Sequence, residues 1–173
     1  RIPAEITRLP QPLVEAIKYF DSLVQASDLI VAHNVEFDKK WFGIDKLPEI
    51  DKRWICSMDD ISWPADRQLK SRPSVRDLAL AYGVPVWNAH RALTDCIYIA
   101  EVFKRCGELE NLLVRALEPK VLFRAEISYE ERHLAKNAGF RWNDAIKGAW
   151  SRRMTRRDAE KLQFSVIPVD FGN

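Results

Sequence analysis

The sequence lacks the features that mark membrane, secreted and repetitive proteins. No apolar run approaches the roughly 20 residues of a membrane-spanning helix, and the first residues show no signal-peptide pattern. The chain contains no low-complexity segment and no long tandem repeat. These absences predict a soluble globular protein that has no membrane as a partner.

Cysteine is also scarce. The three cysteines, Cys56, Cys96 and Cys106, follow no metal-ligand spacing, and two of them fall in helical apolar patterns. We therefore expect reduced residues of the core and not a disulfide scaffold. Because disulfides are rare in reducing compartments, this use of cysteine indicates a cytoplasmic protein.

A strong net charge is missing as well, because the whole chain carries only +2. The charge is nevertheless uneven along the chain. Residues 1–118 carry 16 Lys and Arg against 18 Asp and Glu, a net −2, whereas residues 119–173 carry 11 against 7, a net +4. An acidic front suits a cation site and a basic tail suits a polyanion. Neither imbalance is large enough to identify a ligand by itself.

Hydrophobic periodicity predicts an α/β arrangement up to about residue 118. The opening, residues 1–10, is expected to be extended, and short strands are expected at 28–33 and 54–58. Helices are expected at 12–25, from about residue 34, at 74–82, within 84–107 and at 108–117. The helix within 84–107 is expected to bury a face formed by Ala92, Cys96, Ile99, Ala100 and Phe103.

The character of the chain changes at Pro119, and we place a domain boundary at about residue 118. The tail, residues 119–173, is expected to form a strand at 121–127, a helix at 129–137, extended Trp-rich segments at 140–154, a helix at 156–162 and a strand at 164–169. Ser128 with Glu131, and Thr155 with Asp158, have the spacing of capping boxes at the two helix starts. This order predicts a small α+β module of the βαββαβ kind.

Two short motifs contain the residues best suited to catalysis. The first is His33-Asn34-x-x-Phe37-Asp38, where a strand passes into a helix, and the second is His90-Arg91-Ala92-x-x-Asp95. Carboxylates are preferred ligands of Mg²⁺ and Mn²⁺, and a histidine with a pKa near ~6.5 can take a proton from water at neutral pH. An aspartate early in a helix more often serves only as a partner for the positive helix end. The occurrence of both motifs in order favours a metal site.

The two motifs resemble those of a known enzyme family. The stretch VAHNVEFDKKWF, residues 31–42, resembles the second exonuclease motif of the DEDDh 3′–5′ exonucleases, the family of the proofreading epsilon subunits of bacterial replicases. The stretch PSVRDLALAYGVPVWNAHRALTDCIYIAEVF, residues 73–103, resembles the third. The resemblance implies that residues 1–118 form a ribonuclease-H-like domain, a mixed sheet flanked by helices.

The resemblance also implies a reaction and a role for each motif residue. The reaction is the removal of nucleotides from single-stranded 3′ ends of DNA or RNA, with two Mg²⁺ or Mn²⁺ ions as cofactors. Asp38 and Asp95 would bind metal, and His90 would be the general base. The implied substrate-binding residues are His33, Asn34, Phe37 and Arg91. His33 also has a purely structural interpretation, and Phe37 is expected to pack beneath the site. A DNA polymerase subunit is a candidate partner, and DNA replication and DNA repair are both open as the setting.

The sequence departs from the family pattern at one important place. The family's first motif, an Asp-x-Glu on the first strand of the sheet, has no counterpart upstream of Asp38. The chain begins with Arg1, and we expect that an N-terminal part carrying this motif is omitted from these 173 residues. Asp38 and Asp95 alone are expected to hold a single ion weakly. The alternative is a non-catalytic module that binds nucleic acid or a polymerase on a degenerate exonuclease fold.

The tail has a separate and weaker resemblance. The stretch EERHLAKNAGFRWNDAIKGAWSRRM, residues 130–154, is similar to a small uncharacterised module with a Gly-x-x-Trp segment and a second tryptophan. We expect Trp142 and Trp150 to form the core of this module. In the alternative, these rings stack on bases while neighbouring cations neutralise phosphates. The candidate accessory nucleic-acid contacts are Arg141, Lys147, Arg152, Arg153, Arg156 and Arg157.

Overall fold

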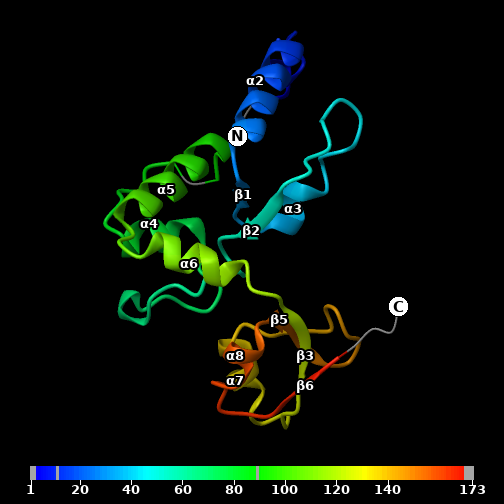
Figure 1. Ribbon diagram of the computed structural model, residues 1–173, viewed down its shortest axis with the longest axis vertical. Coiled ribbons are helices and arrows are strands. Elements are labelled where there is room, and N and C mark those ends of the chain that lie inside the picture. Colours follow the sequence, from blue (N-terminus) through cyan, green and yellow to red (C-terminus); the bar gives the residue numbers. More distant parts are fainter. Residues whose placement is uncertain (1–2, 11, 89, 170–173) are drawn as a thin grey trace. The chain divides into compact units, whose positions relative to one another are not determined.

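The computed structural model in Figure 1 describes residues 3–10, 12–88 and 90–169. The chain divides into two compact units, Arg1–Ile55 and Cys56–Asn173. It is a mixed α/β protein with a small two-stranded parallel sheet of order β1-β2 and a four-stranded antiparallel sheet of order β4-β5-β3-β6. The predicted α/β class is therefore confirmed, while the boundary proposed at about residue 118 lies within the second unit and stays a prediction.

No helix among residues 3–10, 12–88 and 90–169 is both long enough and apolar enough to span a membrane.

The first unit contains one long helix and the parallel strand pair. Its elements are α1 (Ala4–Thr7), α2 (Leu13–Ala26), β1 (Leu29–Ala32), α3 (Val35–Lys39) and β2 (Arg53–Cys56), the last of which runs into the second unit. Stacked rings join the unit: Phe20 of α2 lies 5.5 Å from Phe42, which lies 5.7 Å from Trp54 of β2. The predicted extended opening is wrong at residues 4–7, where α1 forms directly after Pro3, which is itself extended at φ −60° and ψ 143°. Residues 1 and 2 of that prediction lie outside the described residues.

Three helices and a short 3₁₀ turn follow in the second unit. They are η1 (Ala65–Arg67), α4 (Val75–Ala81), α5 (Ala92–Arg105) and α6 (Leu109–Ala116). A capping box begins α4, in which Asp77 N–H donates to Ser74 Oγ at 3.1 Å and Ser74 N–H donates to Asp77 Oδ2 at 2.9 Å. Gly83 has a φ of +67°, the left-handed conformation that commonly ends a helix. These boundaries agree with the prediction to within one or two residues.

The predicted buried face of α5 is wrong. Its fully buried residues are Tyr98 and Val102, whereas Ala92, Cys96 and Ala100 are exposed and Ile99 and Phe103 are half-buried. Two neighbouring stripes of α5 are apolar at helical spacing, so periodicity alone does not choose between them. The Tyr98 ring decides the choice, because it packs at 5.0 Å against the Trp87 ring.

Among the cysteines, Cys56 and Cys106 are buried as expected and Cys96 is exposed.

The tail forms the predicted βαββαβ order. Its elements are β3 (Val121–Ala125), α7 (Arg132–Asn137), β4 (Arg141–Trp142), β5 (Trp150–Met154), α8 (Arg156–Ala159) and β6 (Val166–Pro168). Both helices lie on the same side of the sheet (Figure 1), over a core of Phe123, Ala135, Phe140, Met154 and Ala159.

The two predicted caps of the tail have different outcomes. Thr155 caps α8 as expected, because its hydroxyl accepts from Asp158 N–H at 3.1 Å. Ser128 accepts from Glu131 N–H at 3.3 Å, but this bond closes a turn and α7 begins only at Arg132. The Thr155 cap therefore starts a helix, whereas the Ser128 turn only precedes one.

Candidate functional site

The first motif lies where β1 ends and α3 begins. Asn34 precedes α3 in a left-handed conformation with a φ of 69°, and its carbonyl accepts from Phe37 N–H at 2.9 Å. Asp38 follows on α3 with a half-buried side chain, and burial raises the pKa of its carboxyl above the usual value. No partner for this carboxylate occurs in the described part of the chain. A desolvated carboxylate without a partner gains stability from a bound cation.

The other residues of this motif differ in their surroundings. His33 is half-buried and Asn34 is exposed. Phe37 does not pack beneath the site as expected, because 55% of it is exposed and Lys40 Nζ lies 4.5 Å from its ring centroid. An exposed ring beside a lysine remains available to stack on a planar ligand.

The second motif lies at the start of α5. His90 is exposed and left-handed, with a φ of 67°, and Arg91 is the half-buried residue that precedes the helix. Asp95 occupies the first turn, where its backbone N–H donates to Arg91 O at 2.8 Å. Neither the His90 imidazole nor the Asp95 carboxylate has a hydrogen bond or ion pair with another described residue. Both groups are thus uncommitted within the described part of the second unit.

The segment before His90 is held by a buried tyrosine. The hydroxyl of Tyr98, whose side chain is fully buried, accepts from Trp87 N–H at 2.9 Å and from Asn88 N–H at 3.0 Å. These bonds fix the backbone two residues before His90. Sequence reasoning missed this anchor, because a tyrosine at a helical core spacing carries no sign of a loop contact.

The metal centre implied by the resemblance would draw on residues of both units. Asp38 lies in the first unit, whereas His90 and Asp95 lie in the second, and each unit is described by itself. Within residues 3–10, 12–88 and 90–169, no group of three or more His, Cys, Asp or Glu side chains is gathered that could hold a metal ion. The convergence of Asp38 and Asp95 on one ion therefore stays a prediction.

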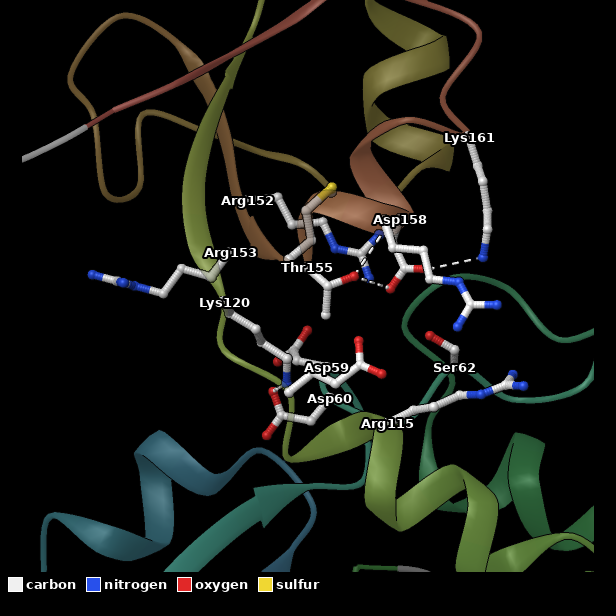
Figure 2. Close-up of a pocket in the computed structure, with 13 residues that line it drawn as sticks. Asp59, Asp60, Ser62, Arg115, Lys120, Arg152, Arg153, Thr155, Asp158 and Lys161 are labelled. Atoms are coloured by element: carbon white, nitrogen blue, oxygen red, sulfur yellow. Dashed lines mark hydrogen bonds and ion pairs between the residues drawn. The ribbon is translucent and has the colours of Figure 1, made fainter.

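A polar pocket of about 50 Å³ in the second unit was not predicted. It is lined by the segment before η1, the end of α6 and the β5–α8 connection, as Figure 2 shows. The lining residues are Asp59, Asp60, Ser62, Arg115, Glu118, Lys120, Arg152, Arg153, Met154, Thr155, Arg157, Asp158 and Lys161. They come from three distant parts of the sequence, so no local pattern announces the pocket.

Ion pairs occupy most of this pocket. Asp60 pairs with Lys120, Asp59 pairs with Arg72, and Asp158 Oδ1 lies 3.1 Å from Lys161 Nζ. Arg152 points toward Asp158 (Figure 2), donates to the Ala138 carbonyl, and has its pKa lowered by burial. These ion pairs join separate segments of the second unit. The lining residues Arg115, Arg153 and Arg157 have no carboxylate partner among the described residues.

The arginines predicted as nucleic-acid contacts therefore differ in availability. Arg152 is held inside the pocket, whereas Arg153 points away from it (Figure 2). Arg156 and Arg157 are exposed, and Arg141 is exposed with its guanidinium 3.5 Å from Asp144. Three exposed arginines without a carboxylate partner among the described residues remain as candidates, namely Arg153, Arg156 and Arg157.

The two tail tryptophans also differ. Trp150 packs against the module core, as expected, whereas Trp142 is 57% exposed. The core interpretation is therefore correct for Trp150 and wrong for Trp142. The reason is that β4 is an edge strand of two residues, which leaves one side of Trp142 uncovered.

Comparison with known proteins gives one match. Residues 121–169 match the family model of a domain of unknown function, DUF8626. This range begins with β3 and extends one residue beyond β6, so it coincides with the βαββαβ module. No curated protein and no solved structure matches the chain.

Proposed function

We propose that this chain contributes Asp38, His90 and Asp95 to a 3′–5′ exonuclease that removes nucleotides from single-stranded 3′ ends of DNA or RNA. The proposal includes a ribonuclease-H-like fold for the front of the chain and two-metal-ion hydrolysis. It rests on the resemblance of residues 31–42 and 73–103 to the DEDDh motifs. The structure supports it through the local surroundings of the three side chains.

One observation carries the proposal: the side chains of Asp38, His90 and Asp95 have no hydrogen bond or ion pair within the described ranges. Several other acids of the second unit are held in ion pairs, namely Asp59, Asp60, Asp77 and Asp158. Asp38, His90 and Asp95 have no such partner among the described residues. Asp38 and Asp95 are half-buried. Carboxylates that are partly removed from water without a partner destabilise a fold, and such groups are common at functional sites.

A second observation supports the same assignment. Each motif enters its helix through a left-handed residue other than glycine, Asn34 at a φ of 69° and His90 at a φ of 67°. The left-handed conformation is costly for residues other than glycine. Non-glycine residues that adopt it cluster at active sites and ligand clamps. Asn34 precedes Asp38 by four residues, and His90 precedes Asp95 by five.

The proposed mechanism assigns a task to each residue. Asp38 and Asp95 would hold divalent ions together with two further carboxylates, which the described residues do not bring beside them. When bound, a pair of such ions lowers the pKa of water and neutralises charge on the phosphate and the leaving oxygen. His90, exposed at the start of α5, would take the proton from the attacking water. Phe37, with its exposed ring, would contact the terminal nucleotide.

The test is hydrolysis of a 5′-labelled single-stranded oligonucleotide by the natural protein in Mn²⁺. Asp38→Ala and Asp95→Ala should each abolish most of the activity, because each removes a ligand of a charge that the transition state needs. His90→Ala should lower the rate by about 10²–10⁴-fold and leave oligonucleotide affinity unchanged. Asp51→Ala is the matched control, since Asp51 is an exposed acid outside both motifs.

Two results would contradict the proposal. A wild-type rate in Asp38→Ala or Asp95→Ala would end the assignment of metal ligands. Binding of the oligonucleotide by the natural protein without any hydrolysis would favour the alternative, a non-catalytic module that binds nucleic acid. Comparing the hydrolysis rates of a DNA and an RNA oligonucleotide of the same sequence identifies the preferred substrate.

A further inference from the structure

An open hollow lies on the DUF8626 module, and none of its lining residues belongs to the two motifs. It has a volume of about 360 Å³ and is lined by Arg124, Ala125, Glu126, Ile127, Trp142, Gly148, Ala149 and Trp150. The strand register explains how these residues meet. Trp142 of β4 is opposite Trp150 of β5, and Arg124 of β3 is opposite Ser151. One step further along the antiparallel register, Ala125 therefore lies beside Trp150.

Small residues keep the hollow open. Ala125 and Ala149 present only methyl groups to it, and Gly148, at a φ of +70°, has no atom within 4 Å of where a Cβ would be. The connection between β4 and β5 is nevertheless ordered by hydrogen bonds. Gly148 N–H donates to Asn143 Oδ1 and Asn143 N–H donates to Ala149 O, both at 2.9 Å. The space is thus a built feature of the hairpin and not a loose loop.

The two indoles offer a flat apolar surface inside this hollow. The ring centroids of Trp142 and Trp150 lie 5.8 Å apart at an interplanar angle of 58°, and Trp142 is 57% exposed. Trp150 is anchored by the core, so it supports Trp142 from one side. Exposed aromatic rings that are grouped in one hollow can mark a ligand-binding site. Planar rings are the ligands that stack best on such a surface.

The preference for a phosphate-bearing ligand comes from the charge of the module and not from the lining alone. Arg124 and Glu126 both line the hollow and form a loose ion pair of 3.8 Å. Lys147 is the neighbour of Gly148, is exposed, and has no partner in the described ranges. Tryptophan pairs also bind quaternary ammonium ions. The net +4 of residues 119–173 disfavours a cation and favours a polyanion.

From this geometry we infer that the hollow is a binding site for a base of single-stranded nucleic acid. Trp142 stacks on the base, Trp150 supports Trp142, and Arg124 with Lys147 neutralises the adjoining phosphates. Single-stranded nucleic-acid sites generally combine aromatic platforms with cations along the backbone. Stacking needs neither a metal ion nor the residues of the two motifs, so the site is independent of the proposed hydrolysis.

The test is the affinity of the full chain for labelled 12-mers in EDTA, where no metal-dependent cleavage occurs. The probes are oligo-dT, oligo-U and an abasic DNA 12-mer with the same number of phosphates. Trp142→Ala should weaken binding of the base-bearing oligomers by about 5- to 150-fold, the range that corresponds to one stacked base. The same variant should leave the affinity for the abasic oligomer unchanged. Trp142→Phe, which keeps a ring, should restore most of the affinity.

Two further variants separate stacking from charge. Tyr129→Ala is the matched control, because Tyr129 is an aromatic residue of the same module, is 73% exposed and lies outside the hollow. It should bind as the wild type does. Arg124→Gln should reduce the slope of log affinity against log salt by about 0.7, the value for one neutralised phosphate on a single strand. Trp142→Ala should leave that slope unchanged.

The proposal has clear contrary outcomes. It is overturned if Trp142→Ala binds oligo-dT and oligo-U as the wild type does, or if the abasic oligomer binds as tightly as oligo-dT. Trp142 is exposed on an edge strand, so its variants are expected to fold, and circular dichroism checks this. The ratio of oligo-dT to oligo-U affinity tells whether DNA or RNA is preferred. Because the assay excludes metal, its failure leaves the exonuclease proposal untouched.

Discussion

Replacing Lys120 by methionine should destabilise the junction between α6 and β3. Lys120 Nζ pairs with Asp60 and also donates to the Ala116 carbonyl at 3.1 Å, while Asp60 Oδ2 accepts from Cys56 N–H at 2.7 Å. The variant keeps the aliphatic stem of the side chain but leaves the Asp60 carboxylate with a single backbone donor. The chain segments joined here lie 60 residues apart, so their association depends on side-chain chemistry and not on local structure.

The magnitude follows from burial. The two side chains are 18% and 22% exposed, so the pair is neither at the surface nor fully enclosed. Surface pairs contribute about 0–1 kcal/mol, and removing one partner of a buried pair costs about 3–5 kcal/mol. We expect Lys120→Met to lower the free energy of unfolding by about 2 kcal/mol, between these limits. The double variant Lys120→Met/Asp60→Asn should recover about half of this lost free energy of unfolding. The amide oxygen of the new asparagine still accepts from Cys56 N–H, and no charge is left unpaired.

Hydrogen exchange of the backbone amides in α6 and β3 measures this locally. A destabilisation of about 2 kcal/mol predicts roughly 30-fold faster exchange of the protected amides. Lys104→Met is the matched control, because Lys104 and Glu101 form an ion pair of 2.7 Å at the surface, and it should leave the exchange unchanged. Equal exchange in Lys120→Met and the wild type would refute the reasoning, and so would a double variant that is less stable than the single one.

Three further perturbations have defined outcomes. Lys70 and the Ser74 backbone N–H lower the pKa of Asp77 to about 2. Because this pKa is depressed, ionised Asp77 stabilises the folded state fully above the unfolded pKa of about 3.9. This stabilisation is lost as the pH falls through about 2. Asp77→Asn should therefore cost about 1 kcal/mol at pH 7, reduced from the full linkage value by the exposure of the pair, and nothing at pH 2, as thermal unfolding would show. Tyr98→Phe leaves the Trp87 and Asn88 N–H groups without their acceptor. It should lower the free energy of unfolding by about 1–3 kcal/mol. It should also lower the hydrolysis rate, because His90 is displaced, with no change in oligonucleotide affinity. Deleting residues 119–173 should leave residues 1–118 folded but destabilised by the loss of the Asp60–Lys120 pair. It should reduce the salt dependence of single-strand affinity by about 0.7 for each phosphate that the tail neutralises, whereas an unchanged slope would make the tail cations an ordinary solvated face.

The sequence predicts those parts of the fold that local chemistry decides. Ser74 and Thr155 begin α4 and α8 as their capping patterns indicate, because a cap involves only the first turn of its helix. The order of strands and helices in the tail was predictable for the same reason, since each element has its own periodicity and its own boundary residues. The position of Asp38 on the helix that follows β1 is predictable from the apolar run that forms the strand.

The sequence does not predict what distant segments decide. The buried face of α5 depends on Tyr98 meeting Trp87, and the pocket depends on Asp60 meeting Lys120, so neither is written in a local pattern. Trp142 was expected in the core because tryptophan is usually buried, and its exposure depends on where the sheet ends. The same limit holds for the candidate site, because the motifs lie in separate units and only tertiary structure can bring their carboxylates together.

The central claim is that Asp38 and Asp95 share a metal site, and paramagnetic broadening by Mn²⁺ tests it most directly. In a titration of the isotope-labelled chain, amide signals near Asp38 on α3 and near Asp95 on α5 should broaden together, at the same Mn²⁺ concentration. Asp38→Ala should abolish the broadening around both residues, and Asp51→Ala should change neither. Broadening near only one of the two aspartates, or broadening near Asp95 that survives Asp38→Ala, would show that the carboxylates do not meet at one ion and would contradict the account.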